Sequence, residues 1–138
     1  MDDARQQRIL ELVSEGERLA GQRELGTALL RYREALALIP RPVEEHDAAA
    51  RVLTAIGDMC FLLGRYSEGK YALQGAVRSC AGPSVPFIHL RLGQCELELG
   101  NRERAVDELA RAYKGGGEEL FSGEDPKYLG LLGAAHSR

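Results

Sequence analysis

Three histidines are the side chains in this sequence best suited to acid–base or metal chemistry, and their spacing does not form a site. His46, His89 and His136 are far apart, and none has a second histidine at the helical spacing of a metal-binding pair. His46 lies in the acidic run 44–47, which could be a weak metal or pH-sensing site. The favoured interpretation is an acidic first turn that complements a helix dipole. His89 is expected to pack with a polar tip, and no metal site is predicted.

The three cysteines, Cys60, Cys80 and Cys95, also lack the spacing of a reactive or metal-binding set. They are separated by 20 and 15 residues, so the sequence contains no Cys-x-x-Cys pair. Cys60 and Cys95 fall within apolar helical patterns and are predicted to be small core residues. This usage is typical of a reducing compartment, and a cytoplasmic location is expected.

Other catalytic motifs are missing from the sequence. It contains no Gly-x-Gly-x-x-Gly, no P-loop lysine pattern and no serine at a nucleophile elbow. The paired glutamates at 44–45 and 118–119 are read as solvated helix starts. An enzyme needs convergent groups with perturbed pKa values, so the sequence predicts no catalytic residues and no cofactor.

Composition places the chain among globular helical proteins. It has 138 residues, of which 44% are hydrophobic and 28% are charged, which suits a single domain over 1–138. Leu and Ala total 38 residues against 12 for Val, Ile and Thr, a balance that favours helices. The net charge of −3 argues against nucleic acid as the main partner. No apolar stretch is long enough for a membrane helix, and the charged start lacks a secretory signal.

Apolar periodicity and helix-ending residues divide the chain into seven expected helices. Apolar residues recur at helical spacing between the prolines and glycines that punctuate the chain. The predicted ranges are 4–20, 25–39, 43–63, 68–80, 86–99, 101–114 and 127–133.

Several residues are predicted to define these boundaries. Gly64 is expected to end one helix in a left-handed conformation, and Ser67 to cap the next. Asn101 is the expected cap of the sixth helix, and the run 115–117 of three glycines must break it. Asp125 before Pro126 is typical of a helix start.

An internal repeat underlies this helical pattern. When the chain is aligned on Gly16, Gly57 and Gly93, small residues recur 12 and 19 positions on, and a large residue recurs 16 positions on. The recurring residues are Ala28, Gly69 and Ala105, then Tyr32, Leu73 and Leu109, then Ala35, Ala76 and Ala112. Small residues are needed where two helices approach closely, so each segment is expected to be a helix pair.

These residues resemble the pattern of the tetratricopeptide repeat (TPR) family, whose unit is a 34-residue helix pair. The repeats are about 9–42, 50–83 and 86–117. The matching residues are Leu12, Gly16, Leu19, Ala28, Tyr32, Ala35 and Pro40 in the first repeat; Leu53, Ile56, Gly57, Cys60, Gly64, Tyr66, Gly69, Leu73 and Ala76 in the second; and Leu92, Gly93, Gly100, Ala105, Leu109 and Ala112 in the third. The chain departs from the family in having no tryptophan and glycine intervals of 41 and 36 residues.

The resemblance implies an all-α, right-handed superhelix of three antiparallel helix pairs with a C-terminal capping helix over about 118–138. Two interpretations of that C-terminal part stay open. It could be a lid or tethered self-ligand over the binding surface. The favoured interpretation is a cap that covers the end of the last repeat.

In the TPR family the first helix of each pair lines a concave groove, which implies where a partner would bind. Phe61, Phe87 and Leu90 are the expected apolar anchors, and Arg51 and Arg91 the expected readers of carboxylates. Alternatively, the two phenylalanines pack between helices and the arginines are merely solvated. The full set of predicted partner-binding residues is Arg51, Thr54, Asp58, Phe61, Phe87, Leu90, Arg91, Gln94 and Glu98.

Some TPR co-chaperones hold the acidic C-terminus of heat-shock chaperones with a clamp of Lys, Asn and Arg. The corresponding positions here are Val13, Glu17, Ala55, Phe87 and Arg91, of which only Arg91 fits. The sequence therefore predicts that this class of peptide is not the partner. A mixed apolar and charged groove suits a segment with hydrophobic anchors.

The expected function is that of a non-catalytic scaffold or interaction module that binds a peptide or protein in its concave groove. The alternative is a dedicated chaperone or immunity-type protein that masks one cognate bacterial effector. Of the 18 basic residues 15 are Arg, which favours a GC-rich bacterial genome. Self-association through an uncapped end is a further expectation.

Overall fold

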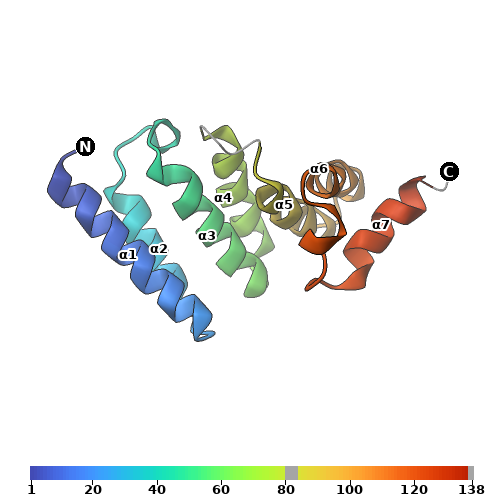
Figure 1. Ribbon diagram of the computed structural model, residues 1–138, viewed down its shortest axis with the longest axis horizontal. Coiled ribbons are helices and arrows are strands. Elements are labelled where there is room, and N and C mark those ends of the chain that lie inside the picture. The colour runs from blue at the N-terminus through green and yellow to red at the C-terminus, as the bar shows by residue number, and fades with distance from the viewer. Residues whose placement is uncertain (80–83, 137–138) are drawn as a thin grey trace.

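The computed structural model describes residues 1–79 and 84–136, and this part of the chain is built mainly of α-helices (Figure 1). The elements are α1 (Asp3–Gly21), α2 (Leu25–Leu38), η1 (Val43–Glu45), α3 (Ala48–Leu62), α4 (Tyr66–Arg78), α5 (Pro86–Glu98), α6 (Arg102–Leu120) and α7 (Pro126–His136). Cys80 lies outside the described residues. None of the helices in the described ranges is long and apolar enough to cross a membrane.

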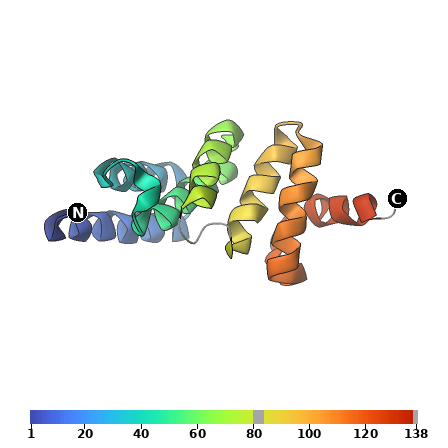
Figure 2. The same ribbon diagram turned by 90° about the horizontal axis from the view of Figure 1, so that it is seen from above.

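The helices form three antiparallel pairs that follow one another along the long axis of the molecule. The pairs are α1 with α2, α3 with α4, and α5 with α6, and contacts of α2 with α3 and of α4 with α5 join them. The N-terminus and α7 lie at opposite ends (Figures 1 and 2). This is the predicted all-α, right-handed superhelix with a further helix at its C-terminal end.

The repeated glycines explain how the helices of each pair approach closely. Each glycine packs against the large side chain 16 residues further on: Gly16 on Tyr32, Gly57 on Leu73 and Gly93 on Leu109. A Cβ atom at Gly93 would lie 2.7 Å from Cγ of Leu109, closer than packed carbon atoms allow. The alanines 19 positions on are all fully buried. The helix-pair interpretation of the repeat is confirmed at this atomic level.

Most predicted boundaries agree with the structure within a few residues, and one predicted helix is wrong. The range 43–63 is not one helix, because His46 adopts an extended conformation between η1 and α3. Val43 on η1 is buried in the core, which fixes this separate turn. The prediction that Ser67 caps a helix is also wrong, since α4 already begins at Tyr66.

The predicted start of α7 and the glycine end of α3 are confirmed. The Asp125 carboxylate accepts a hydrogen bond from the backbone N–H of Lys127 at 2.9 Å. Gly64 has a φ of 77°, as the left-handed end of a helix requires. Asn101 lies at the cap position of α6, but its side chain donates to Glu96 instead of to its own helix.

The glycine run 115–117 breaks α6 later than expected. The helix continues beyond Lys114, and the non-helical residue is Gly117, with φ 66° and ψ −167°. A last turn then leads to Phe121. Because the backbone turns at Gly117, the following residues cross back towards α5.

The core consists of two groups of buried side chains. The larger group joins α1–α4 to one side of α5, and the free thiols of Cys60 and Cys95 lie in it as predicted. The smaller group combines α5 and α6 with the C-terminal residues. Its members are Leu90, Ala105, Leu109, Ala112, Phe121, Tyr128, Leu131 and Leu132. Half of this smaller core is therefore supplied by residues after Gly117.

Candidate binding groove

A hollow of about 440 Å³ lies between the first helices of the three pairs, and we call it the groove. Its lining comes from α1, α3, the start of α5 and Tyr32 of α2. The lining residues are Val13, Glu17, Ala20, Tyr32, Ala50, Arg51, Thr54, Ala55, Asp58, Met59, Val85, Phe87 and Ile88. Small residues on α1 and α3 leave this space open.

The groove is largely apolar, and the hydroxyl of Thr54 is already hydrogen-bonded within its own helix. Ala20, Ala50, Ala55 and Phe87 are half-buried, so they present apolar surface to the hollow. The Thr54 hydroxyl donates a hydrogen bond to the backbone carbonyl of Ala50 at 2.6 Å. Burial raises the pKa of Tyr32 to about 12, so its phenol is neutral near pH 7.

Each charged residue that lines the groove is paired with a residue of opposite charge. Arg51 donates to both carboxylate oxygens of Glu17 at 2.8 Å, which joins α3 to α1. Asp58 accepts a hydrogen bond from Nε of Arg91 at 2.9 Å, which joins α3 to α5. A ligand entering the groove therefore meets Glu17, Arg51 and Asp58, each of which already has a partner of opposite charge.

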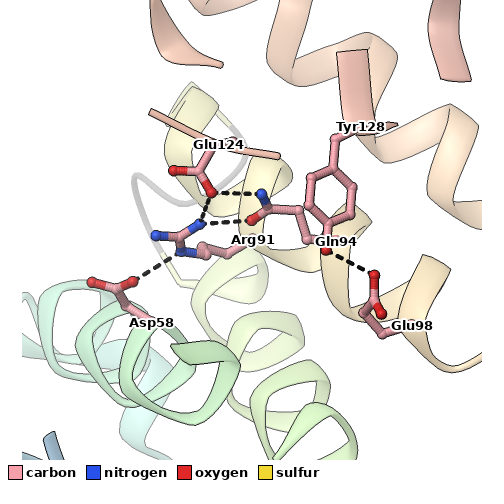
Figure 3. A network of polar contacts seen from close by, with 6 residues as sticks. All are labelled: Asp58, Arg91, Gln94, Glu98, Glu124 and Tyr128. Atoms are coloured by element: carbon pink, nitrogen blue, oxygen red, sulfur yellow. Dashed lines mark hydrogen bonds and ion pairs between the residues drawn. The ribbon is translucent and has the colours of Figure 1, made fainter. Parts of the chain in front are cut away.

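Arg91 is buried and belongs to a hydrogen-bond network that extends to the C-terminal part of the chain (Figure 3). Its side chain is only 8% exposed. One terminal nitrogen donates to Glu124 at 2.5 Å and to the amide oxygen of Gln94 at 2.7 Å. The Gln94 amide also donates to Glu124 at 2.7 Å. A single carboxylate is thus held by two buried donors of α5.

Two aromatic rings complete the surroundings of Arg91. Its guanidinium lies 4.7 Å from the ring centroid of Phe61 and 5.0 Å from that of Phe87. Cations are attracted to such ring faces, more strongly when water is excluded. Because Phe87 and Asp58 also line the groove, Arg91 connects the groove with Glu124.

A second set of polar contacts joins the same face of α5 to α7. The hydroxyl of Tyr128 donates to Glu98 at 2.8 Å, and Nζ of Lys127 lies 2.9 Å from the same carboxylate oxygen. The hydrogen bond from Lys127 is the main cause that lowers the pKa of Glu98. Burial, and then the bond to Glu98, raise the pKa of Tyr128 well above its usual range.

The structure divides the predicted partner-binding residues into two groups. Arg51, Thr54, Asp58 and Phe87 line the open groove. The others lie on or against the side of α5 covered by C-terminal residues: Phe61, Leu90, Arg91, Gln94 and Glu98. The role of either group in partner binding stays a prediction.

Two of those expectations need correction. Leu90 is not an exposed anchor, because its side chain is 1% exposed and packs in the smaller core. Arg91 is not a free reader of carboxylates, because Asp58 and Glu124 already bind its guanidinium. Phe61 and Phe87 are half-buried, and Phe61 contacts the ring of Tyr128 as well as that of Tyr66.

His89, Cys60 and Cys95 are packed within the fold. His89 is 6% exposed, and its Nδ1 lies 2.6 Å from a carboxylate oxygen of Glu108, which confirms it as a packing residue with a polar tip. Burial raises the pKa of the Cys95 thiol to about 12 and also raises that of Cys60. Across residues 1–79 and 84–136, no group of three or more His, Cys, Asp or Glu side chains could hold a metal ion.

Sequence reasoning missed Glu124 and Tyr128, which shape the face of α5 most directly. Glu124 lies in the loop before α7, where no helical period identifies a buried partner. Tyr128 lies in the part of the chain that the family resemblance implies is a cap, but the sequence did not show where its hydroxyl would bond. The three-residue spacing of Arg91 and Gln94 was the one available signal of a shared face.

Comparison with known proteins supports the fold. No protein-family model matches the chain, and no curated protein sequence is detectably similar to it. Solved structures do match along nearly the whole chain. The C-terminal TPR-containing domain of a Plasmodium falciparum FK506-binding protein is 14% identical with a TM-score of 0.78, covering 99% of this chain and 91% of that one.

Two further matches were solved with bound peptides. The first TPR domain of Spaghetti (RPAP3), bound to the HSP90 peptide SRMEEVD, is 17% identical with a TM-score of 0.70, covering 95% of this chain and 92% of that one. The Yersinia enterocolitica type III secretion chaperone SycD, in complex with a peptide of the translocator YopD, is 15% identical with a TM-score of 0.69, covering 90% and 88%. The chain therefore has the TPR fold.

Proposed function

We propose that this chain is a non-catalytic interaction module that binds a segment of a partner protein in the groove. The observation that carries the proposal is an open, mainly apolar hollow on the first helices of a TPR fold. Repeat proteins of this kind use such extended surfaces for binding. The peptide complexes of structurally similar domains support the same use here.

The pairing of charges in the groove favours an uncharged, apolar segment. An acidic peptide such as SRMEEVD needs cations that are free to bind its carboxylates. Among the described lining residues Arg51 is held by Glu17, and behind them Arg91 is held by Asp58 and Glu124. An apolar side chain can instead bury itself against Ala55 and Phe87 without separating these pairs.

A dedicated chaperone for one effector is the second candidate. It is favoured by the likeness to SycD, which spans 88% of that secretion chaperone. Both candidates place the partner on the same face of the molecule. They differ in the number of partners: one stoichiometric partner supports a dedicated chaperone, and several weak partners support a general module. A bacterial origin and a cytoplasmic location are part of this second proposal.

Selection of peptides from a random library against the full chain tests the binding site. Ala55→Arg places a long charged side chain in the groove, whereas Ala37→Arg makes the same change at an exposed position of α2. We expect selected peptides to be apolar with little net charge. Their affinity should fall at least about 10-fold for Ala55→Arg, which corresponds to about 1.4 kcal/mol, and be unchanged for Ala37→Arg.

If both variants keep their helical content and bind the selected peptides as well as the unmodified chain does, the partner does not use the groove. Selection of strongly acidic peptides would contradict the expected ligand chemistry.

A further inference from the structure

The face of α5 that continues the groove is occupied by the chain itself. Arg91, Gln94 and Glu98 are spaced three and four residues apart, so they share one face of this helix. Each is bonded to a residue after Gly117. On α3, Arg51, Thr54 and Asp58 have the same spacing, and they line the open groove. We call residues 118–136 the C-terminal segment.

The C-terminal segment is held by contacts of the kind that hold a bound peptide. The Glu124 carboxylate is bonded to Arg91 and Gln94, whose side chains are almost completely buried. Charge-assisted bonds of this kind are strong and directional. Figure 3 shows these donors converging on Glu124 while Tyr128 reaches Glu98 alongside.

The apolar contacts of the segment follow a regular pattern that begins at Glu124. Tyr128, Leu131 and Leu132 lie four, seven and eight positions further on, and all three are buried. They pack with Leu90 and Leu109 in the smaller core. This spacing is how an amphipathic helix presents its anchors to a groove.

A single non-helical residue, Gly117, separates the C-terminal segment from the main part of α6, which precedes it. Gly117 has a positive φ, which interrupts the helix before the segment begins. The segment is therefore joined to the helix pair by a turn and docks through side chains. Four of its apolar side chains, Phe121, Tyr128, Leu131 and Leu132, are buried, so release of the segment would expose apolar surface unless equivalent groups replaced them.

We propose that the C-terminal segment is an internal occupant of the binding face, and that a partner helix can take its place. The partner that fits carries an acidic residue followed at positions +4, +7 and +8 by aromatic or aliphatic residues. Binding of this helix would extend the groove along α5 to Glu98. This inference rests on the proposed use of the same face for partner binding.

The segment itself, synthesised as a peptide, is a probe for this exchange. A fluorescent peptide of residues 118–136 is titrated against the full chain, and binding is measured by anisotropy. In the unmodified chain the tethered copy competes at an effective concentration in the millimolar range, so the peptide should bind weakly. Glu124→Gln in the chain weakens the tethered copy, so the peptide should bind at least about 10-fold more tightly.

Two controls separate exchange from a general loosening of the chain. Glu119→Gln makes the same chemical change in the same segment at an exposed side chain, and should leave the affinity unchanged. A peptide that itself carries Glu124→Gln should lose most of the gain on the Glu124→Gln chain. If the Glu124→Gln chain loses helical content, the titration is done with the Tyr128→Phe chain instead. That substitution removes only the hydroxyl that is bonded to Glu98.

Equal peptide binding by the Glu124→Gln and Glu119→Gln chains would overturn the proposal and leave the segment as a cap. That result is distinguishable from failure of the proposed function. The library peptides test the open groove through Ala55→Arg, whose outcome does not depend on release of the segment.

Discussion

At the scale of single residues, the three repeated glycines determine how closely the helices of each pair approach. Gly93 lies directly over Leu109 in the third pair. Replacing Gly93 with Ala adds a methyl group where no space exists, and overpacking of a core costs about 1–3 kcal/mol. We expect the free energy of unfolding, measured with urea, to fall by that amount.

Gly130→Ala is the matched control for that prediction. Gly130 is exposed within α7, and a Cβ there meets no atom within 4 Å. Removal of a glycine from a helix interior should stabilise the chain by about 0.5–1 kcal/mol. If the two substitutions had the same effect, close approach at Gly93 would not be the reason for its glycine.

Residue types and spacing could predict these glycines but not the environment of Arg91. A small residue 16 positions before a large one is a local pattern that is repeated three times. It predicts directly that the two helices of a pair approach closely at that point. The partners of Arg91 lie 33 residues away on either side, at Asp58 and Glu124. Helical periodicity placed Arg91 on the correct helix, but it could not show that another loop covers it.

At the scale of elements, Glu98 of α5 binds two residues of α7, so we expect the docking of α7 to depend on the charge of Glu98. The carboxylate accepts a hydrogen bond from Tyr128 and pairs with Lys127, and its pKa is lowered below its ordinary value of 4.5. A carboxyl group whose pKa is lower in the folded chain stabilises the fold above its unfolded pKa. That contribution is lost as the pH falls through the lowered value.

The free energy of unfolding of the unmodified chain and of Glu98→Gln, measured over pH 3–7, tests the contribution of this carboxylate. Above about pH 5 the variant should be less stable by about 0.5–1.5 kcal/mol, the usual net contribution of such bonds. The difference should shrink as the pH falls below 4.5. A difference that stays constant down to pH 3 would show that the ionised form of Glu98 does not stabilise the docking.

Element boundaries were predictable where a local backbone signal marks them. Pro126 after Asp125, and Gly64 after α3, have conformations that those residues prefer in any context. The split between η1 and α3 was not predictable, because burial of Val43 in the core determines it. Tertiary packing outweighs helical periodicity at that point.

At the scale of the whole molecule, the array is open at its first two helix pairs and closed at its third. Short-range contacts between successive helices build the array, which is why repetition in the sequence predicts the architecture well. The closure comes from residues after Gly117 that cross back onto α5. The groove between α1, α3 and the start of α5 is consequently the part of this side of the molecule that stays open.

Amide chemical-shift mapping of the full chain with its tightest library-selected peptide shows which residues the peptide contacts. We expect chemical-shift changes concentrated around Val13, Thr54, Ala55 and Phe87, which line the groove. Residues around Ala37 on α2 should be unaffected. Shifts concentrated on α2 and α4, with the groove residues unchanged, would contradict the assignment of the groove as the binding site.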